Sequence, residues 1–209
     1  MKFSDEVAER SVVEARARAT AEVTALMDAG LAVLARDGAA FTVASVLREA
    51  DMSTRAFYRH FQSKDELVVA VYERDAEETI VRLAKRVGEA VEPRGAVDVW
   101  VDEILALVYD SRRVRRTSPL ASESARLQSQ FPHVFARILE RQLEPLEDAL
   151  ERGRVDGTFP ATDPTADARS IHAVTWAVIE QRMLGHRRNR AEARDHILRF
   201  CLPALGARP

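Results

Sequence analysis

The residues best suited to bind another molecule lie in a short basic segment at positions 53–64. This segment, STRAFYRHFQSK, contains three cationic side chains: Arg55, Arg59 and Lys64. It contains no acidic side chain. An arginine can donate two hydrogen bonds to guanine O6 and N7, and Thr54 can contact a thymine methyl group. Tyr58, His60 and Lys64 carry donors that suit phosphate oxygens. The segment therefore has the chemistry of a DNA contact.

Helical spacing would divide this segment into two faces. Phe57 and Phe61 lie one helical turn apart and are expected to be buried. The opposite face would carry four polar side chains: Thr54, Arg55, Tyr58 and Arg59. A short helix with one buried side and one donor-rich side can enter a major groove.

Other helices must position this one. Apolar residues spaced by three and one predict an amphipathic helix over 16–36. Thr42 is the expected N-cap of a short second helix and Ser53 that of the third, so the two would be joined by a tight turn. SKDE at 63–66 is a capping box that begins a long helix reaching about residue 90. Exposed amides at the helix starts capped by Thr42, Ser53 and Ser63 also favour phosphate.

The remainder of the chain also reads as helical. Apolar stripes predict helices around 97–108, 132–152 with a kink at Pro145, and 191–205. Asp163 followed by Pro164 is a typical helix start, and the helix to residue 184 is apolar over a wide arc. No segment shows strand-like alternation, so we expect an all-α fold.

The segment FTVASVLREADMSTRAFYRHFQSKDELVVAVYE resembles, over its whole length, the DNA-binding signature of the TetR family of transcriptional repressors. The resemblance implies about nine helices, three of them in an N-terminal helix-turn-helix domain and the others in a C-terminal ligand-binding and dimerisation domain. With the helix pattern, it predicts a flexible arm at 1–15, the DNA-binding domain at 16–62 and the C-terminal domain at 63–209. Asp51 stands where the family usually has a turn glycine, and Leu47 replaces a customary alanine.

Carried over by position, the resemblance implies phosphate contacts from Thr42, Tyr58, His60 and Lys64. It implies base-edge contacts from the segment between Ser53 and Arg55. It further implies a homodimer, formed by the last two helices of each chain, that binds a palindromic operator with its two recognition helices about 34 Å apart. The expected function is repression of transcription, relieved by a small-molecule effector.

Six large side chains in the C-terminal domain are candidates to line an effector cavity: Trp100, Tyr109, Phe131, Phe135, Trp176 and Met183. Ordinary core packing is the alternative for each of them, because aromatic residues at helical spacing usually form core. If they line a cavity, the effector would be hydrophobic. The arginine-rich run SRRVRR at 111–116 is expected to be a solvent-exposed loop.

The sequence argues against several other classes of protein. Enzyme motifs such as GxSxG, GK[ST] and HExxH are missing, and the histidines are scattered, so we expect no catalysis, cofactor or metal. Cys201 is the only cysteine and is expected to be buried in a protein of the reducing cytoplasm. No signal peptide and no membrane span of roughly 20 apolar residues is recognisable. A helical protein-binding module is the main rival, and the acid-free basic face favours DNA over it.

Overall fold

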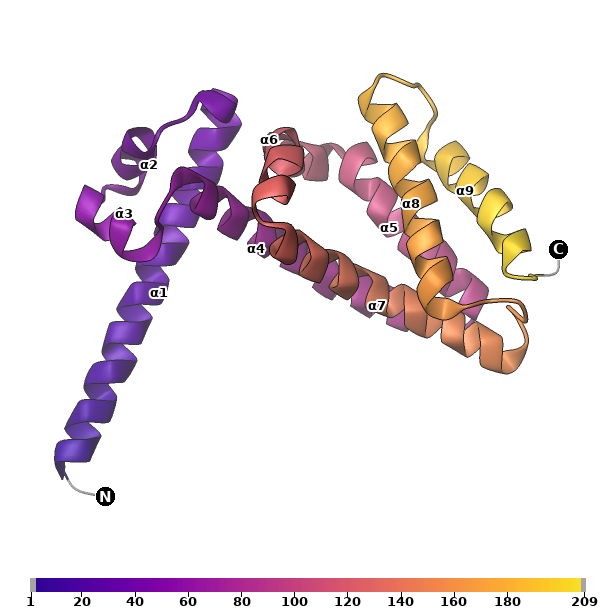
Figure 1. Ribbon diagram of the computed structural model, residues 1–209, viewed down its shortest axis with the longest axis horizontal. Coiled ribbons are helices and arrows are strands. Elements are labelled where there is room, and N and C mark those ends of the chain that lie inside the picture. Colours follow the sequence, from indigo (N-terminus) through magenta and orange to yellow (C-terminus); the bar gives the residue numbers. More distant parts are fainter. Residues whose placement is uncertain (1–2, 208–209) are drawn as a thin grey trace. The chain divides into compact units, whose positions relative to one another are not determined.

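The computed structural model describes residues 3–207, except for the side chains of residues 3, 4, 6, 7, 39, 112, 115–119, 121 and 122. These residues form nine α-helices, one short 3-10 helix and no strand, as expected of an all-α protein (Figure 1). The helices are α1 (Phe3–Asp37), η1 (Gly38–Ala40), α2 (Val43–Ala50), α3 (Thr54–His60), α4 (Lys64–Gly88), α5 (Pro93–Tyr109), α6 (Ser111–Gln130), α7 (Pro132–Asp156), α8 (Pro164–Met183) and α9 (Arg190–Ala204). Among the described residues, no helix is long and apolar enough to cross a membrane.

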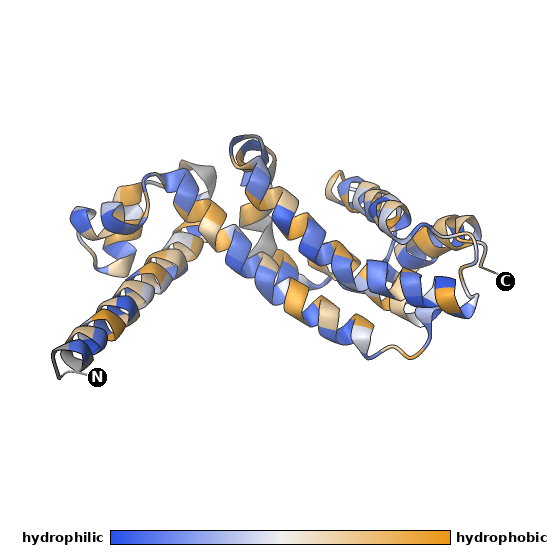
Figure 2. Cartoon of the chain, turned by 60° about the horizontal axis from the view of Figure 1, so that its bottom comes forward, coloured by the Kyte–Doolittle hydropathy of each residue, from blue (hydrophilic) through white to orange (hydrophobic). Residues whose placement is uncertain are grey.

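The chain divides into two compact units, which we describe separately. The first unit contains the chain up to Arg74 together with Pro119–Gln130, and the second contains Asp75–Ser118 and the chain from Phe131 onward. Helices α4 and α6 each begin in one unit and end in the other. Hydrophilic and hydrophobic residues recur along each long helix, as amphipathic packing requires (Figure 2).

Helix α1 begins well before the expected start at residue 16. Residues 3–15, expected as a flexible arm, are helical. The reason is local, because this stretch contains no glycine or proline and is rich in the strong helix formers Ala, Glu and Arg. The described side chains from 8 to 18 are exposed, and full burial begins at Leu26. The apolar stripe therefore marked where α1 becomes buried and not where it begins.

Helices α2 and α3 begin and end where the cap residues predicted. The Ser45 amide donates to Thr42 Oγ1 over 3.2 Å, and the Thr42 amide donates to Ser45 Oγ over 3.0 Å. Helix α3 begins after Ser53, whose hydroxyl accepts from the Ala56 amide at 3.2 Å. Between the helices Asp51 is left-handed, with φ 51° and ψ 46°, and its amide donates to the Leu47 carbonyl oxygen. Asp51 thus adopts the conformation for which glycine is normally used.

Asp51→Gly is expected to raise the free energy of unfolding by about 0.5 kcal/mol. A left-handed backbone costs a residue with a side chain roughly 1 kcal/mol, part of which is offset because glycine is freer in the unfolded chain. Urea unfolding followed by far-UV circular dichroism measures the change. Asp51→Ala is the control and should be less stable than the wild type, so a destabilised glycine variant would contradict this account.

The first unit extends beyond the boundary expected at residues 62 and 63. Leu67 and Val68 of α4 are buried, and the Leu67 side chain lies so close to α1 that a Cβ atom at Gly30 would be 3.0 Å from its Cδ2. Arg126 of α6 donates to both carboxylate oxygens of Asp65 at 2.7 and 2.8 Å. This bond lowers the pKa of Asp65 below its ordinary value. The start of α4 is therefore fixed from two sides within this unit.

Helix α6 was not predicted, and the expected loop at 111–116 is wrong. The run SRRVRR forms the first turns of α6, although the side chains of Arg112, Arg115 and Arg116 lie outside the described residues. Apolar residues are sparse in α6, whose only large aliphatic side chains are Val114, Leu120 and Leu127. Leu120 and Leu127 nevertheless bury their side chains completely or almost so.

The core of the second unit is built around α5, which packs against α7, α8 and α9. Trp100 is fully buried, and its indole Nε1 donates to the carbonyl oxygen of Gln142 at 2.9 Å. Helix α7 continues through Pro145 as one helix from Pro132 to Asp156, so the proline does not end it. Cys201 is buried in the same core, and burial raises the pKa of its thiol to about 11.

One carboxylate of this core is surrounded by arginines. Glu103 is only 2% exposed, and its side chain accepts from Arg113 at 2.9 Å, from Arg82 at 3.3 Å and from Arg86. Burial would raise the pKa of Glu103, but the hydrogen bond from Arg113 and the three positive charges together hold it below its ordinary value. Glu103 is therefore charged at neutral pH and connects α5 with α4 and α6.

Candidate nucleic-acid interface

The short helix α3 is fixed in the first unit by its aromatic side. The Phe57 side chain is fully buried, and that of Phe61 is 6% exposed. Their ring centroids lie 5.7 Å apart, and the ring of Tyr58 meets Phe57 edge to face at 5.3 Å. This packing leaves the opposite side of α3 for contact with another molecule.

We call that opposite side the reading face and define it by Thr54, Arg55 and Tyr58. All three side chains are exposed, and Tyr58 is 58% exposed despite its size. A phenol that meets water can donate a hydrogen bond to a phosphate oxygen. The structure thus brings three of the predicted contact residues together on one surface, which begins at the exposed cap Ser53.

Thr42 and Lys64 flank the reading face in sequence and are each tied to nearby groups. Thr42 is exposed, and its side chain takes part in the cap of α2. The Lys64 ammonium donates to the carbonyl oxygen of Phe41 at 3.3 Å and lies 4.6 Å above the centre of the Phe41 ring. The Lys64 ammonium is thus held beside Phe41 at the start of α4.

The structure places Arg59 and His60 differently from the prediction. Glu22 of α1 accepts from the Arg59 guanidinium at 3.0 and 3.3 Å, and His60 Nε2 lies 2.7 Å from the same carboxylate. The His60 side chain is only 10% exposed. The bond with His60 is the main cause that lowers the pKa of Glu22, and the charge of Arg59 acts in the same direction.

Glu22 is a residue that sequence reasoning missed. The basic segment at 53–64 has no acid of its own, but folding brings one from 37 residues earlier in the chain. The contact of Glu22 with α3 depends on which face of α1 packs against α3. That packing is not readable from the sequence alone. The basic face without a nearby acid is therefore smaller than predicted, because Arg59 is paired with Glu22.

The six candidate cavity residues differ in how far they are buried. Trp100 is core, and Trp176 and Met183 are 40% and 59% exposed. His172 contacts both tryptophans, with ring centroids 6.3 Å from Trp100 and 5.9 Å from Trp176, and burial lowers its pKa. Phe131 and Phe135 lie half-buried at the start of α7.

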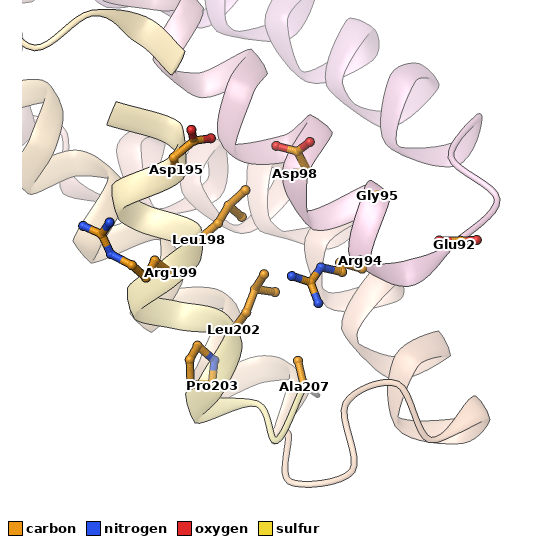
Figure 3. A pocket seen from close by; sticks show the side chains of 10 residues that line it. All are labelled: Glu92, Arg94, Gly95, Asp98, Asp195, Leu198, Arg199, Leu202, Pro203 and Ala207. Carbon is orange, nitrogen blue, oxygen red and sulfur yellow. The ribbon is translucent and has the colours of Figure 1, made fainter. Parts of the chain in front are cut away.

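Two hollows are defined among the described residues of the second unit. The larger, of about 740 Å³, is open and lies between the start of α5 and α9. Figure 3 shows Asp98 and Asp195 at one end of it, with Arg94 extending toward Leu202. The smaller, of about 100 Å³, is lined in part by Tyr109, above whose ring Arg182 lies at 5.0 Å. Tyr109 is the one candidate residue that borders either hollow. No cluster of described His, Cys, Asp or Glu side chains could hold a metal ion.

Helices α1, α2 and α3 of the first unit, which we call the head, form a helix-turn-helix arrangement with a capped recognition helix. This arrangement is that of a DNA-binding protein. Residues 26–71 match the family model of "Bacterial regulatory proteins, tetR family". Residues 26–71 thus carry the DNA-binding domain of the tetR family of bacterial regulatory proteins, as the sequence signature indicated. No curated protein sequence matches it significantly.

Solved structures share the fold over most of the chain. FadR from Bacillus subtilis, in complex with stearoyl-CoA, is 14% identical, with a TM-score of 0.69 over 87% of this chain and 98% of that one. A putative TetR-family regulator from Mesorhizobium loti is 18% identical, with a TM-score of 0.68 over 90% and 96%. AibR, in complex with isovaleryl coenzyme A and operator DNA, is 17% identical, with a TM-score of 0.62 over 87% and 98%. At these identities the likeness establishes the fold alone.

Proposed function

We propose that the chain is a repressor that binds a palindromic operator as a homodimer and is released by a small-molecule effector. The observation that carries DNA reading is the exposed reading face, supported from behind by the buried ring of Phe57. The exposed arginine on this face can make the bidentate contact with guanine that specifies a base. Such a function places the protein in the cytoplasm, where the operator lies.

The proposed contacts divide into two kinds. Ser53, Thr54 and Arg55 read base edges, because they occupy the N-terminal turn of α3, the part of a recognition helix that reaches furthest into the groove. Phosphate contacts come from Thr42, Tyr58 and Lys64. Arg59 and His60, also predicted as contacts, are left out of this set because Glu22 binds both of them.

Titration of fluorescent DNA duplexes at several salt concentrations tests DNA binding. The purified protein should bind duplexes selected from its own upstream DNA more tightly than a scrambled duplex. Lys64→Ala should weaken binding to every duplex and lower the slope of log affinity against log salt by about 0.9, the value for one phosphate contact. A protein that ignores every duplex at low salt would refute the proposed function.

An exposed apolar surface on α8 and α9 supports the proposed dimer. Four large apolar side chains there remain in contact with solvent: Trp176, Met183, Leu184 and Phe200, which are 40%, 59%, 82% and 68% exposed. Ile179 is buried in the core and lies one turn before Met183 on the same face, so the apolar arc of α8 is wider than its contact with the core. A second copy of the same two helices would cover the exposed part of this arc. Trp176 and Met183 are thereby assigned to the dimer instead of a cavity.

Phe200→Glu is expected to convert the dimer into a monomer at micromolar concentration. A charge placed in an apolar interface is desolvated without a partner, and the operator affinity of the monomer should fall with it. Sedimentation velocity measures the assembly state. Val155→Glu, at an equally exposed apolar residue on α7, is the control and should remain dimeric. A wild-type protein that sediments as a monomer would contradict this assignment.

Two continuous helices, α4 and α6, offer a route from an effector in the second unit to the DNA-binding head. The bidentate bond between Arg126 and Asp65 joins the last turns of α6 to the first turn of α4, directly beside Lys64. An effector that displaces either helix would change the spacing of the two heads. Coupling of this kind amounts to about 1–3 kcal/mol, which changes operator affinity roughly 5- to 150-fold.

Acyl-CoA compounds are suitable first probes, because two structural neighbours bind them. Stearoyl-CoA and isovaleryl-CoA should each be added to the protein–operator complex, with free coenzyme A as the control. Release by one acyl-CoA but not by coenzyme A would support an effector with a hydrophobic part. Arg126→Gln should then reduce the response to the effector while retaining DNA binding.

A further inference from the structure

Glu22 occupies an unusual position for an acidic residue in a DNA-binding head. Its carboxylate binds the last two side chains of α3, with Arg59 at 3.0 Å and His60 at 2.7 Å. The Glu22 side chain is 20% exposed. Two potential phosphate donors therefore share one internal acceptor.

The charges at the end of α3, where Arg59 and His60 meet Glu22, do not favour the binding of a phosphate group. Arg59 is 53% exposed and could reach a phosphate if it were free, but its charge is compensated by the carboxylate beside it. A phosphate group approaching this end of α3 would also be repelled by Glu22. Arg55 forms no ion pair with any residue that the structure describes. Its positive charge on the reading face is therefore not compensated.

We propose that Glu22 is a specificity-determining residue that withholds Arg59 and His60 from the DNA backbone. It lowers the sequence-independent affinity of the head for DNA and leaves base reading by Arg55 intact. The ratio of specific to nonspecific affinity rises as a result, which is the quantity that matters against a genome full of competing sites. This inference rests on the proposed DNA-binding function.

Glu22→Gln tests the inference with little change in shape. We expect the variant to bind a random-sequence 24-bp duplex about tenfold more tightly at 50 mM salt, because freed Arg59 gains one phosphate contact. The slope of log affinity against log salt should steepen by about 0.9. Affinity for the preferred duplex should rise by clearly less than that factor, so that the ratio of specific to nonspecific affinity falls, and an equal gain for both duplexes would overturn the specificity role.

Two variants separate this effect from a general change of charge. Asp28→Asn removes one negative charge from the same helix, where the carboxylate pairs with Arg74 at 2.8 Å, and should leave the salt slope unchanged. Glu22→Gln combined with Arg59→Ala should return the slope to the wild-type value. An Asp28→Asn variant with the same gain as Glu22→Gln, or a double variant that keeps the gain, would overturn the proposal.

Arg59→Ala alone gives a second test that does not depend on the folding of the Glu22 variant. If Glu22 withholds Arg59, this variant should keep the wild-type salt slope, whereas Lys64→Ala should lower it. Equal losses in the two variants would overturn the assignment of Glu22. Failure of the wild-type protein to bind any duplex would instead refute the DNA-binding function, so the two failures are distinguishable.

Discussion

Arg55→Ala is expected to abolish most of the sequence preference of the protein. Arg55 is exposed on the reading face, and bidentate contact between an arginine and a guanine contributes about 1–3 kcal/mol of discrimination. The variant should therefore lose roughly 5- to 150-fold in affinity for the preferred duplex. A scrambled duplex should lose far less, and fluorescence anisotropy with both duplexes measures the difference.

Arg55→Lys is the matched control for this experiment. Lysine keeps the positive charge but lacks the planar pair of donors that fits O6 and N7 of guanine. The lysine variant should retain nonspecific affinity and salt dependence while losing most of its preference for the selected sequence. If Arg55→Ala weakens both duplexes equally, the residue contacts phosphate and the base-reading role is wrong.

Glu103→Ala is expected to destabilise the second unit by about 2–4 kcal/mol. Removal of one partner from a buried ion pair leaves uncompensated charge, which typically costs about 3–5 kcal/mol, and here the partly exposed arginines can regain some water. Both tryptophans of the chain, Trp100 and Trp176, lie in this unit, so tryptophan fluorescence during urea unfolding reports on it. Glu77→Ala is the control, because Glu77 pairs with Arg141 at the surface, where solvent screens the pair, and its loss should change stability far less.

Glu103 also predicts how stability depends on pH. Its pKa is lower in the folded protein than in the unfolded chain, so the ionised form contributes stability above about pH 4.5. This contribution disappears as the pH falls through the lowered pKa. Glu103→Gln should therefore reduce the loss of stability in acid, as measured by thermal unfolding between pH 3 and pH 6. An unchanged acid profile would mean that other carboxylates determine it.

Local signals predicted much of the head. The caps at Thr42 and Ser53, the tight turn at Asp51 and the burial of Phe57 all depend on residues within one or two helical turns. These features could be predicted because cap hydrogen bonds and helical periodicity are short-range. The exposure of Arg55 followed from the same periodicity.

What could not be predicted depends on residues distant in the sequence. Glu22 reaches Arg59 only because α1 packs beside α3, and Arg113 reaches Glu103 only because the basic run at 111–116 folds back as α6. Helix α6 itself is held by a few buried leucines and long-range ion pairs, and its sequence has few apolar residues. The cavity lining stays a prediction for a related reason, since size and aromaticity do not distinguish core from lining.

The close contact between Leu67 and Gly30 has a mechanical consequence. Because Gly30 has no side chain, the Leu67 side chain of α4 packs directly against the backbone of α1 at this position. A rotation of α4 would therefore press on α1, which packs against α2 and α3. A larger residue at position 30 would displace the Leu67 side chain and change the angle between α1 and α4, although it would contact neither DNA nor effector.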